Sequence, residues 1–525
     1  MIGYRKFFYL ILLSLIFLTI FKITLYYNFE PRSDQAHQIG WINKIINSKF
    51  LISQEAIKDL KNIINDYQGL IFELVKPTFF YGNLHANYFH LSSILIISIF
   101  AKFSEISEIY IFNILSIISS FLSFYLLFKI LEKLYFEKIK KNYSFFFLVF
   151  FGLFVVNWYS FIFSPLGVHN ISSMIILLNF YLYLNVRKIN FFYIGLLYAI
   201  SSLFHQVNFI ILSLFYFFII FEKINNSKQF IKNLTFFIIG PIFIFSPLVL
   251  IVIMNLDNYS NIVNDINDKN VGIIKVLLNN LIFFIGKNIE YFSFIFFFSI
   301  LTFFCNDKEK FIKNLKLLFF LLILFSIFLN EFFVSSYHRI SIYFFYIYVI
   351  LSFRIIFDLL RYKIFKYFFV LIVIFNVIYN INLIFKNHYP QNSQSEFFSY
   401  FHNQGEIKKT FNEINQKFKL KNIVFLNNLS EDYYNIFNDE KEKFLKKPLN
   451  NFIVKNDKDF SKKIINKEIN LFSFVQNDQL FENVTKELQE NFVRECSLKD
   501  QIYSRNVFKI NDTIYYKIRI DRILC

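Results

Sequence analysis

The chain has 525 residues, of which 56% are hydrophobic and only 18% are charged, and its formal net charge is +17. A composition this apolar excludes a water-soluble globular protein and is typical of a multi-span membrane protein. Because the Lys and Arg residues lie in short clusters between apolar runs, a cytoplasmic membrane surface accounts for them better than nucleic acid, which we do not expect as a partner.

The first apolar run, residues 7–27, is predicted to be a membrane anchor. Arg5 and Lys6 precede it, and no small-residue cleavage site follows it, so we expect an uncleaved anchor with a cytoplasmic N-terminus.

Further apolar runs predict an α-helical polytopic membrane protein. A hydrocarbon core about 30 Å thick needs roughly 20 apolar residues per helix. The predicted spans are residues 7–27, 109–128, 144–163, 168–186, 190–205, 207–221, 232–254, 289–304, 315–333, 339–360 and 365–385. Two weaker candidates are 86–103 and 274–287, which gives about 11–13 spans in the cell's inner (plasma) membrane.

Basic clusters between these runs predict the orientation, because Lys and Arg near helix ends are retained in the cytoplasm. The clusters are Arg5 with Lys6, and residues 129–142, 187–190, 222–233, 306–314 and 361–366. The loop 28–85 and the connections near Pro165, His205, Asp257 and His338 are then expected outside. An odd number of crossings must separate loop 28–85 from the basic loop 129–142. We therefore expect 86–103 not to cross fully, unless the basic loop breaks the charge rule.

Two domains are predicted. Residues 1–385 form the multi-span domain, which includes the outer loop 28–85, and residues 386–525 form a small extracytoplasmic α+β domain. In the second domain the patterns predict strands at 421–426 and 469–475, a helix at 481–492, and a hairpin over 506–520 that turns at Asn511 and Asp512. Whether Cys496 and Cys525 pair there is left open by their spacing.

Polar residues follow the first span in an unusual concentration. After Pro31, Asp34 can cap a helix that lies on the membrane surface with Trp41 on its apolar face. Asp34 and His37 are one turn apart at its start, near the lipid headgroups. A plain N-cap role for Asp34 is an equally good interpretation of this spacing.

More polar residues are predicted on the same outer face, at the ends of later spans. They are Lys76, His85 and His90 in "KPTFFYGNLHANYFH", His169 in "SPLGVHN", His205 in "LFHQVN", and His338 with Arg339 in "SSYHRIS". A single His at a helix end is more often a hydrogen-bonded bystander than a ligand. None of these histidines lies in a basic cytoplasmic cluster, however, and this shared sidedness favours a common site.

Arg339 is an exception to the usual distribution of positive charge. Lys and Arg are usually retained on the cytoplasmic side, whereas Arg339 is predicted at the outer start of a span. It is expected to have an anionic partner there, which could be Glu331, a lipid headgroup or a phosphate held by two parallel hydrogen bonds. The sequence has no Cys/His metal-ligand spacing, no phosphate-binding glycine loop and no nucleophile elbow, so no metal site is assigned.

The order of these features resembles the GT-C superfamily of polytopic glycosyltransferases, which includes protein mannosyltransferases and aminoarabinose transferases. The resemblance covers residues 1–390. The family's first-loop acid corresponds to Asp34, its polar segment before the next helix to 76–90, and its late arginine to Arg339. Many relatives carry a second acidic residue in the next outer loop, where this chain has His169 and Asn170. It stays open whether His169 replaces that acid or metal assistance is absent.

The resemblance implies transfer of a sugar from a polyprenyl-phosphate donor to a lipid, glycan or protein acceptor at the outer membrane face. Asp34 would act as general base, with inversion at the anomeric carbon, and Arg339 would stabilise the departing phosphate. The expected donor-binding residues are His37, Lys76, His85, His90, His169, His338 and Arg339. No cofactor is required, and a divalent cation is left open. The alternatives are an O-antigen-type polymerase or ligase, and a lipid-linked sugar flippase or other transporter.

Overall fold

The computed structural model describes the larger part of the chain. The described residues are 2–26, 39, 42, 91–104, 106, 108–155, 168–185, 190–222, 227–254, 273–305, 309–328, 337–388, 409–410, 412–414, 423–425, 468–475, 501–509 and 517–524.

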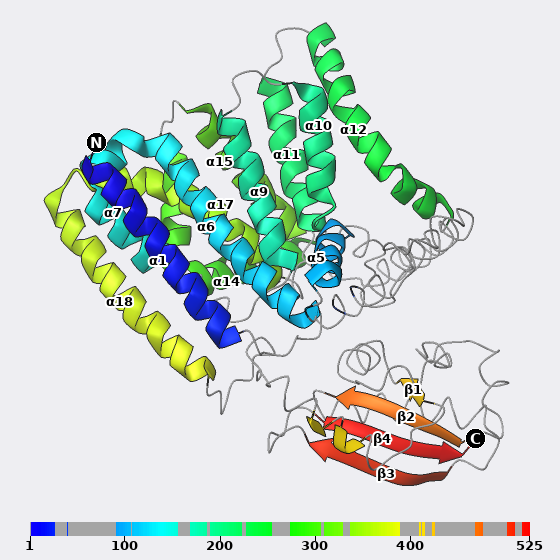
Figure 1. Cartoon of the computed structure of the whole chain (residues 1–525). Helices are drawn as coiled ribbons and strands as arrows, with labels where there is room; N and C mark the ends of the chain where they lie inside the picture. The colour runs from blue at the N-terminus through cyan, green and yellow to red at the C-terminus, as the bar shows by residue number, and fades with distance from the viewer. Residues whose placement is uncertain are drawn as a thin grey trace. The chain divides into compact units, whose positions relative to one another are not determined.

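The described part of the chain is mainly α-helical (Figure 1). Its helices are α1 (Ile2–Tyr26), α5 (Leu91–Ser104), α6 (Glu108–Lys141), α7 (Tyr143–Val149), which continues as the π-helix η1 (Phe150–Val155), α9 (Val168–Asn185), α10 (Phe191–Ser202), α11 (Gln206–Glu222), α12 (Ser227–Met254), α14 (Ile273–Leu301), which ends in the 3-10 turn η2 (Thr302–Phe304), α15 (Lys310–Phe328), α17 (Tyr337–Leu359) and α18 (Lys363–His388).

The chain divides into two compact units. One comprises Met1–Thr24, Ile52–Ile97 and Asn113–Lys386, and the other comprises Leu25–Leu51, Ser98–Phe112 and Asn387–Cys525. The domain boundary predicted between residues 385 and 386 stays a prediction.

Two predictions about the helices are wrong. The expected basic loop 129–142 is helical up to Lys141, because α6 continues from the predicted span 109–128 with a kink at Tyr135. The separate segments 274–287 and 289–304 are a single helix, α14, that runs from Ile273 to Leu301. A lone glycine such as Gly286 costs only about 1 kcal/mol in a helix and does not end it. Asn288 does not cap a new helix either, because its Nδ2 donates back to the carbonyl oxygen of Phe284 at 2.8 Å, within α14.

Of the short segment predicted at 86–103, residues 91–103 lie in α5, and residues 86–90 lie outside the described residues. The described residues of α5 rise about 21 Å at 1.5 Å per residue. Among the described residues, α6 is the one helix that is both long and apolar enough to cross a membrane. Core helices of soluble proteins can meet the same criterion, so the number of spans stays a prediction.

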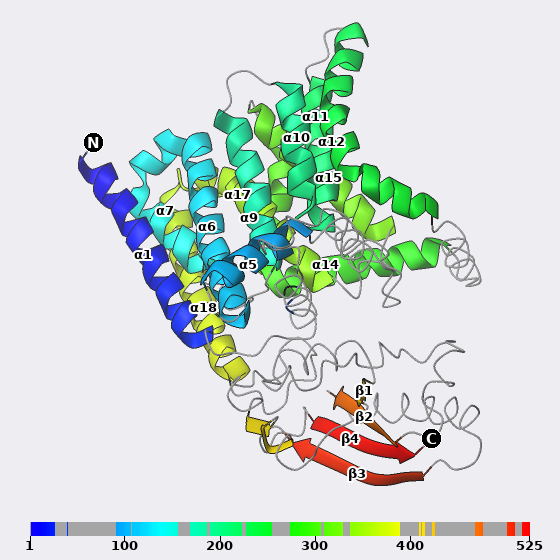
Figure 2. The ribbon, with the colours of Figure 1, turned by 45° about the vertical axis from the view of Figure 1, so that its right-hand side comes forward.

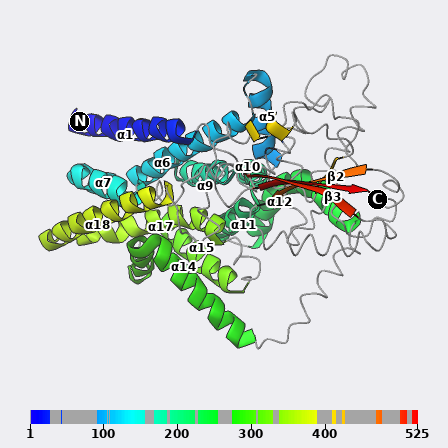
Figure 3. The same ribbon diagram turned by 90° about the horizontal axis from the view of Figure 1, so that it is seen from below.

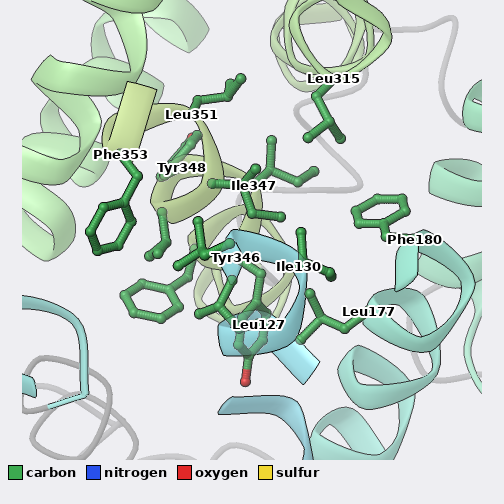
Figure 4. Close-up of a cluster of buried hydrophobic side chains, with 14 of the residues drawn as sticks. Leu127, Ile130, Leu177, Phe180, Leu315, Tyr346, Ile347, Tyr348, Leu351 and Phe353 are labelled. Carbon is green, nitrogen blue, oxygen red and sulfur yellow. The ribbon is translucent and has the colours of Figure 1, made fainter. Parts of the chain in front are cut away.

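Helix α17 is the centre of the first unit. Every side chain from Tyr343 to Phe353 is buried, and a helix that is apolar and buried on all sides must be surrounded by other helices. Figure 4 shows its side chains meeting those of α6, α9 and α15. The labelled members are Leu127, Ile130, Leu177, Phe180, Leu315, Tyr346, Ile347, Tyr348, Leu351 and Phe353.

Glycines allow two of the surrounding helices to cross very closely. A Cβ on Gly195 of α10 would lie 2.0 Å from the carbonyl oxygen of Phe237 in α12, and a Cβ on Gly240 would lie 2.7 Å from the backbone nitrogen of Leu196. Small residues at such crossings let backbones approach, which is the usual way that helices pack within membranes.

The short helix α7 lies between α1 and α18 (Figure 3). Phe7 of α1 packs edge-on against Phe146, with 6.2 Å between ring centroids, and Phe145 packs against Phe369 of α18 at 6.0 Å. These rings hold the first and last described helices of the unit to its core.

The second unit contains a four-stranded sheet in the order β1-β2-β4-β3 (Figure 2). Its strands are β1 (Ile423–Phe425), β2 (Glu468–Val475), β3 (Gln501–Lys509) and β4 (Lys517–Leu524), with β1 parallel to β2 and the other pairs antiparallel. Strands are thus found within or close to the two predicted strand segments, whereas the strands of the predicted hairpin 506–520 extend beyond it at both ends, to Gln501 and Leu524. The predicted helix 481–492, the turn at Asn511 and Asp512, and both Cys496 and Cys525 lie outside the described residues.

Candidate functional site: a buried polar cluster at three helix starts

Two histidines and a tyrosine meet inside the first unit. His169 is the second residue of α9, His205 directly precedes α11, and Tyr343 lies in the second turn of α17; all three are buried. The Nδ1 atom of His169 is 3.2 Å from the Tyr343 hydroxyl. The two imidazole rings lie 4.6 Å apart between centroids, and His205 lies 5.5 Å from the Tyr343 ring.

His205 holds this position because it caps α11. Its Nδ1 accepts a hydrogen bond of 3.0 Å from the backbone N–H of Val207, and its carbonyl oxygen accepts one of 2.9 Å from the N–H of Asn208. An N-cap side chain satisfies an amide that the helix leaves unpaired. Because Nδ1 accepts here, the proton of the neutral ring is on Nε2.

Asn208 joins three helices beside the histidines. Its Oδ1 accepts a hydrogen bond of 2.7 Å from the hydroxyl of Ser172 in α9. Its Nδ2 donates to the carbonyl oxygens of Ser172, at 3.2 Å, and of Ser201 in α10, at 3.1 Å. A buried amide in an apolar surrounding is stable only when it is paired in this way.

A second amide repeats this arrangement deeper in the bundle. Asn179 of α9 donates to the Ser201 hydroxyl at 2.9 Å, and its Oδ1 accepts a hydrogen bond of 2.5 Å from the hydroxyl of Tyr216 in α11. The two asparagines thus fix α9, α10 and α11 to one another by hydrogen bonds as well as by packing.

Helix α6 joins the cluster through Asn170. The Nδ2 of this buried residue donates to the hydroxyl of Ser116 at 2.8 Å, whereas its Oδ1 has no hydrogen-bond partner among the described residues. The start of α5 adjoins the same region, because the N–H of Ser92 donates to the carbonyl oxygen of Leu203 and the hydroxyl of Ser93 to that of Phe204, each at 3.3 Å.

The opposite ends of α6 and α17 meet in an ionic cluster. Lys138 lies 2.9 Å from one oxygen of Asp358, which also lies 3.5 Å from Arg361, and Arg354 pairs with the other oxygen. Three cations therefore share one carboxylate. All four side chains are partly exposed, and Arg361 is the most exposed, at 71%.

The two groups of polar residues lie at opposite ends of the same two helices, α6 and α17. Along α6, Ser116 and Tyr135, where the helix kinks, are about 28 Å apart, and along α17, Tyr343 and Asp358 are about 22 Å apart, each at 1.5 Å per residue. Helix α17 runs in the same direction, from Tyr343 beside the histidines to Asp358 among the cations. We name the first group, His169, His205, Asn208 and Tyr343, the neutral cluster, and the second group, Lys138, Arg354, Asp358 and Arg361, the ionic cluster.

Comparisons with known proteins identify no relative of this chain. No protein-family model matches the chain. No curated protein and no solved structure matches it either.

One of the predicted site residues, His169, belongs to the neutral cluster. His338 and Arg339 lie in the first turn of α17, so that Arg339 precedes Tyr343 by one turn; the described side chains of α17 begin after them. The other predicted residues, Asp34, His37, Lys76, His85 and His90, lie outside the described residues, although His90 directly precedes α5.

Within the described part, no group of three His, Cys, Asp or Glu side chains is placed to hold a metal ion.

Sequence reasoning assigned no role in the site to Tyr343, Ser172 or Asn208, and placed His205 on the outer side without including it. The signal for Asn208 was present, since an amide within a long apolar run needs a partner inside the bundle. Tyr343 gave no such signal, because it is one of 33 tyrosines in the chain.

Proposed function

We propose that this chain is a membrane-embedded glycosyltransferase of the GT-C type. It moves a sugar from a polyprenyl-phosphate donor to a lipid, glycan or protein acceptor at the outer face of the plasma membrane. The observation that carries the proposal is the neutral cluster, where the starts of α9 and α11 meet the beginning of α17. Helix N-termini favour a bound phosphate through their free N–H groups and their dipoles.

Membrane placement is supported by exposed apolar side chains on the outside of several helices. They include Phe17 of α1, Ile282 of α14 and Phe375 of α18. We take the basic residues at the ionic end to mark the cytoplasmic side, with the N-terminus on the same side and the neutral cluster and the C-terminal domain outside. The union of 274–287 and 289–304 in α14 lowers the expected maximum number of spans by one.

The proposed reaction forms a bond between an acceptor oxygen and the anomeric carbon while the bond from that carbon to the phosphate oxygen breaks. Asp34 takes the proton of the acceptor hydroxyl, and polyprenyl phosphate leaves with the electron pair of the broken bond. Direct attack inverts the anomeric carbon. Arg339, with Lys76 or His338, stabilises the charge that develops on the phosphate.

The neutral cluster would position the donor. Arg339 precedes Tyr343 by one helical turn, and His90 directly precedes α5, whose first turn bonds to the residues just before His205. The starts of α5 and α17 are far apart in sequence. They carry or follow proposed donor-binding residues, and both lie at the same end of the bundle. His37, His85 and His169 are proposed to line the donor site with them.

The proposal is tested with the full chain in proteoliposomes and a panel of synthetic polyprenyl-phosphate sugars, by mass-spectrometric detection of released polyprenyl phosphate. Asp34→Asn is expected to lower turnover by about 100- to 10,000-fold, the usual contribution of a general base. Arg339→Gln is expected to lower it by roughly 100- to 1,000-fold, as for removal of a donor to a developing negative charge.

Exposed residues provide matched controls for these charge changes. Glu309→Gln removes an exposed carboxylate, and Arg361→Gln removes an exposed guanidinium of the ionic cluster; both should leave turnover unchanged. Full activity of Asp34→Asn would rule out the proposed general base. Movement of the lipid-linked sugar across the bilayer without release of polyprenyl phosphate would favour the transporter alternative.

A further inference from the structure

The exposed side of α18 is a continuous apolar stripe. Ile364 and Tyr367 are each 74% exposed, and the stripe continues through Leu371, Phe375 and Ile378. The spacing of three or four residues puts them on one face of the helix. The opposite face packs into the bundle through Phe369, Ile372 and Val373, which are buried.

This stripe begins at the ionic cluster. Arg361 and Lys363, both exposed, stand at the start of α18, and Lys366 follows one turn later. From Arg354 to Lys366 the sequence contains four cations and the single carboxylate of Asp358. Lys138 and Arg354 bind that carboxylate more closely than Arg361, which is 3.5 Å away.

We propose that an anionic phospholipid binds at this place, with its headgroup phosphate at Arg361 and Lys363 and an acyl chain along the stripe of α18. The inference rests on the membrane placement within the proposed function and not on the transferase chemistry. Guanidinium and ammonium groups are the usual partners of phosphate in proteins. The excess of positive charge selects an acidic headgroup over a zwitterionic one.

The length of the stripe fits an acyl chain that enters from one leaflet. From Ile364 to Ile378 the helix rises about 21 Å, which exceeds the half-thickness of about 15 Å that one leaflet contributes to the hydrocarbon core. Tyr362 and Tyr367, both exposed, lie at the charged end, where tyrosines favour the boundary between headgroups and hydrocarbon. A phospholipid fits better than a protein partner, because the stripe begins at a cluster with an excess of positive charge and continues as apolar surface.

The test measures lipid binding by native mass spectrometry on the purified full chain in a neutral detergent. Phosphatidylglycerol is expected to bind, and phosphatidylcholine is expected to bind at least tenfold more weakly. The double variant Arg361→Gln/Lys363→Gln should lower the affinity for phosphatidylglycerol about 30-fold, because each basic residue near an anionic surface contributes about fivefold.

A second double variant separates a local site from the general attraction of positive charge. Lys232→Gln/Lys313→Gln removes two exposed cations from other predicted cytoplasmic clusters and should leave the affinity within about twofold. All four substitutions are at exposed side chains, so each variant can be checked for an unchanged melting temperature before lipid is added.

Equal affinity for the two phospholipids, or equal losses in the two double variants, would overturn the proposal. Competition by inorganic phosphate as strong as that by phosphatidylglycerol would show a phosphate site without a lipid, and would overturn it too. The readout does not use transferase activity. Loss of lipid preference therefore leaves the proposed function standing, whereas extraction of the chain from membranes by alkaline carbonate alone would contradict both.

Discussion

Near the start of α17, Tyr343 meets two histidines in a region that water does not reach, and at its end Asp358 meets three partly exposed cations. Both ends join α17 to other helices through polar groups. At the first end the groups are hydroxyls, amides and imidazoles that pair by hydrogen bonds of defined direction. At the second end they are full charges, and three cations share the single carboxylate of Asp358.

The difference has an energetic reason. A buried polar group is costly unless it is paired, so each bond of the neutral cluster restricts how α9, α10 and α11 can pack. Exposed ion pairs contribute little to stability, since water and salt screen them. We infer that the neutral cluster fixes the relative positions of the helices, whereas the ionic cluster fixes the orientation of the protein in the membrane and its contact with lipid.

The strongest test of this contrast is Asn208→Leu. The substitution keeps the branched shape and the number of heavy atoms but removes three hydrogen bonds that join α9, α10 and α11. Interhelical hydrogen bonds within membranes average about 0.6 kcal/mol each, so the free energy of unfolding should fall by roughly 2 kcal/mol. The measurement is unfolding by sodium dodecyl sulfate in mixed micelles, followed by circular dichroism.

Asn185→Leu is the matched control, because Asn185 is exposed and bonds within its own helix to the carbonyl oxygen of Tyr181. Its effect should stay below about 0.5 kcal/mol, as for most surface substitutions. Equal losses in the two variants would mean that the neutral cluster does not fix the helices.

A smaller effect is expected at His205, where capping and a role in substrate binding can be separated. His205→Ala removes the acceptor for the Val207 N–H and should cost about 1 kcal/mol. His205→Asn supplies another good N-cap acceptor and should restore most of this stability. The same unfolding measurement checks both variants.

Turnover of a polyprenyl-phosphate sugar is then compared for the two His205 variants. If the ring only caps α11, His205→Asn should recover turnover together with stability. Restored stability with turnover still low would show that the imidazole also acts on the substrate. Low stability in both variants would contradict the capping role.

The sequence predicts the helices of the first unit better than it predicts their contacts. Apolar runs are a local property, and so the helices are found near the expected positions. The break expected between 274–287 and 289–304 is absent because Gly286 does not outweigh the hydrogen bonds of a continuous helix. The strands of the sheet, such as β2, follow from alternation in the same local way.

The candidate site depends on contacts that no local pattern contains. His169 and His205 could be placed on one side of the membrane by counting basic loops, but their rings meet only because α9 and α11 pack together. Tyr343 joins them from a distance of 174 positions along the chain. Their sidedness stays a prediction, and the composition of the cluster could not be predicted from the sequence.

The smallest predicted effect concerns the ionic cluster, at Lys138→Met. The side chain lies 2.9 Å from Asp358, and both groups are about one-third exposed. Removal should cost about 0.5 kcal/mol at low salt, within the range of exposed ion pairs. At 1 M salt the Debye length falls to about 3 Å, so the difference from wild type should almost vanish, whereas the effect of Asn208→Leu should persist.

Lys141→Met is the control for Lys138→Met, since Lys141 is an exposed cation at the end of the same helix. It should change the free energy of unfolding by less than Lys138→Met at low salt, because the Asp358 carboxylate is held by Lys138, Arg354 and Arg361. If the cost of Lys138→Met proved large and independent of salt, the ionic cluster would also be fixing helix positions. The two ends of α17 would then differ in charge but not in role, and the division between a neutral fixing end and an ionic orienting end would be wrong.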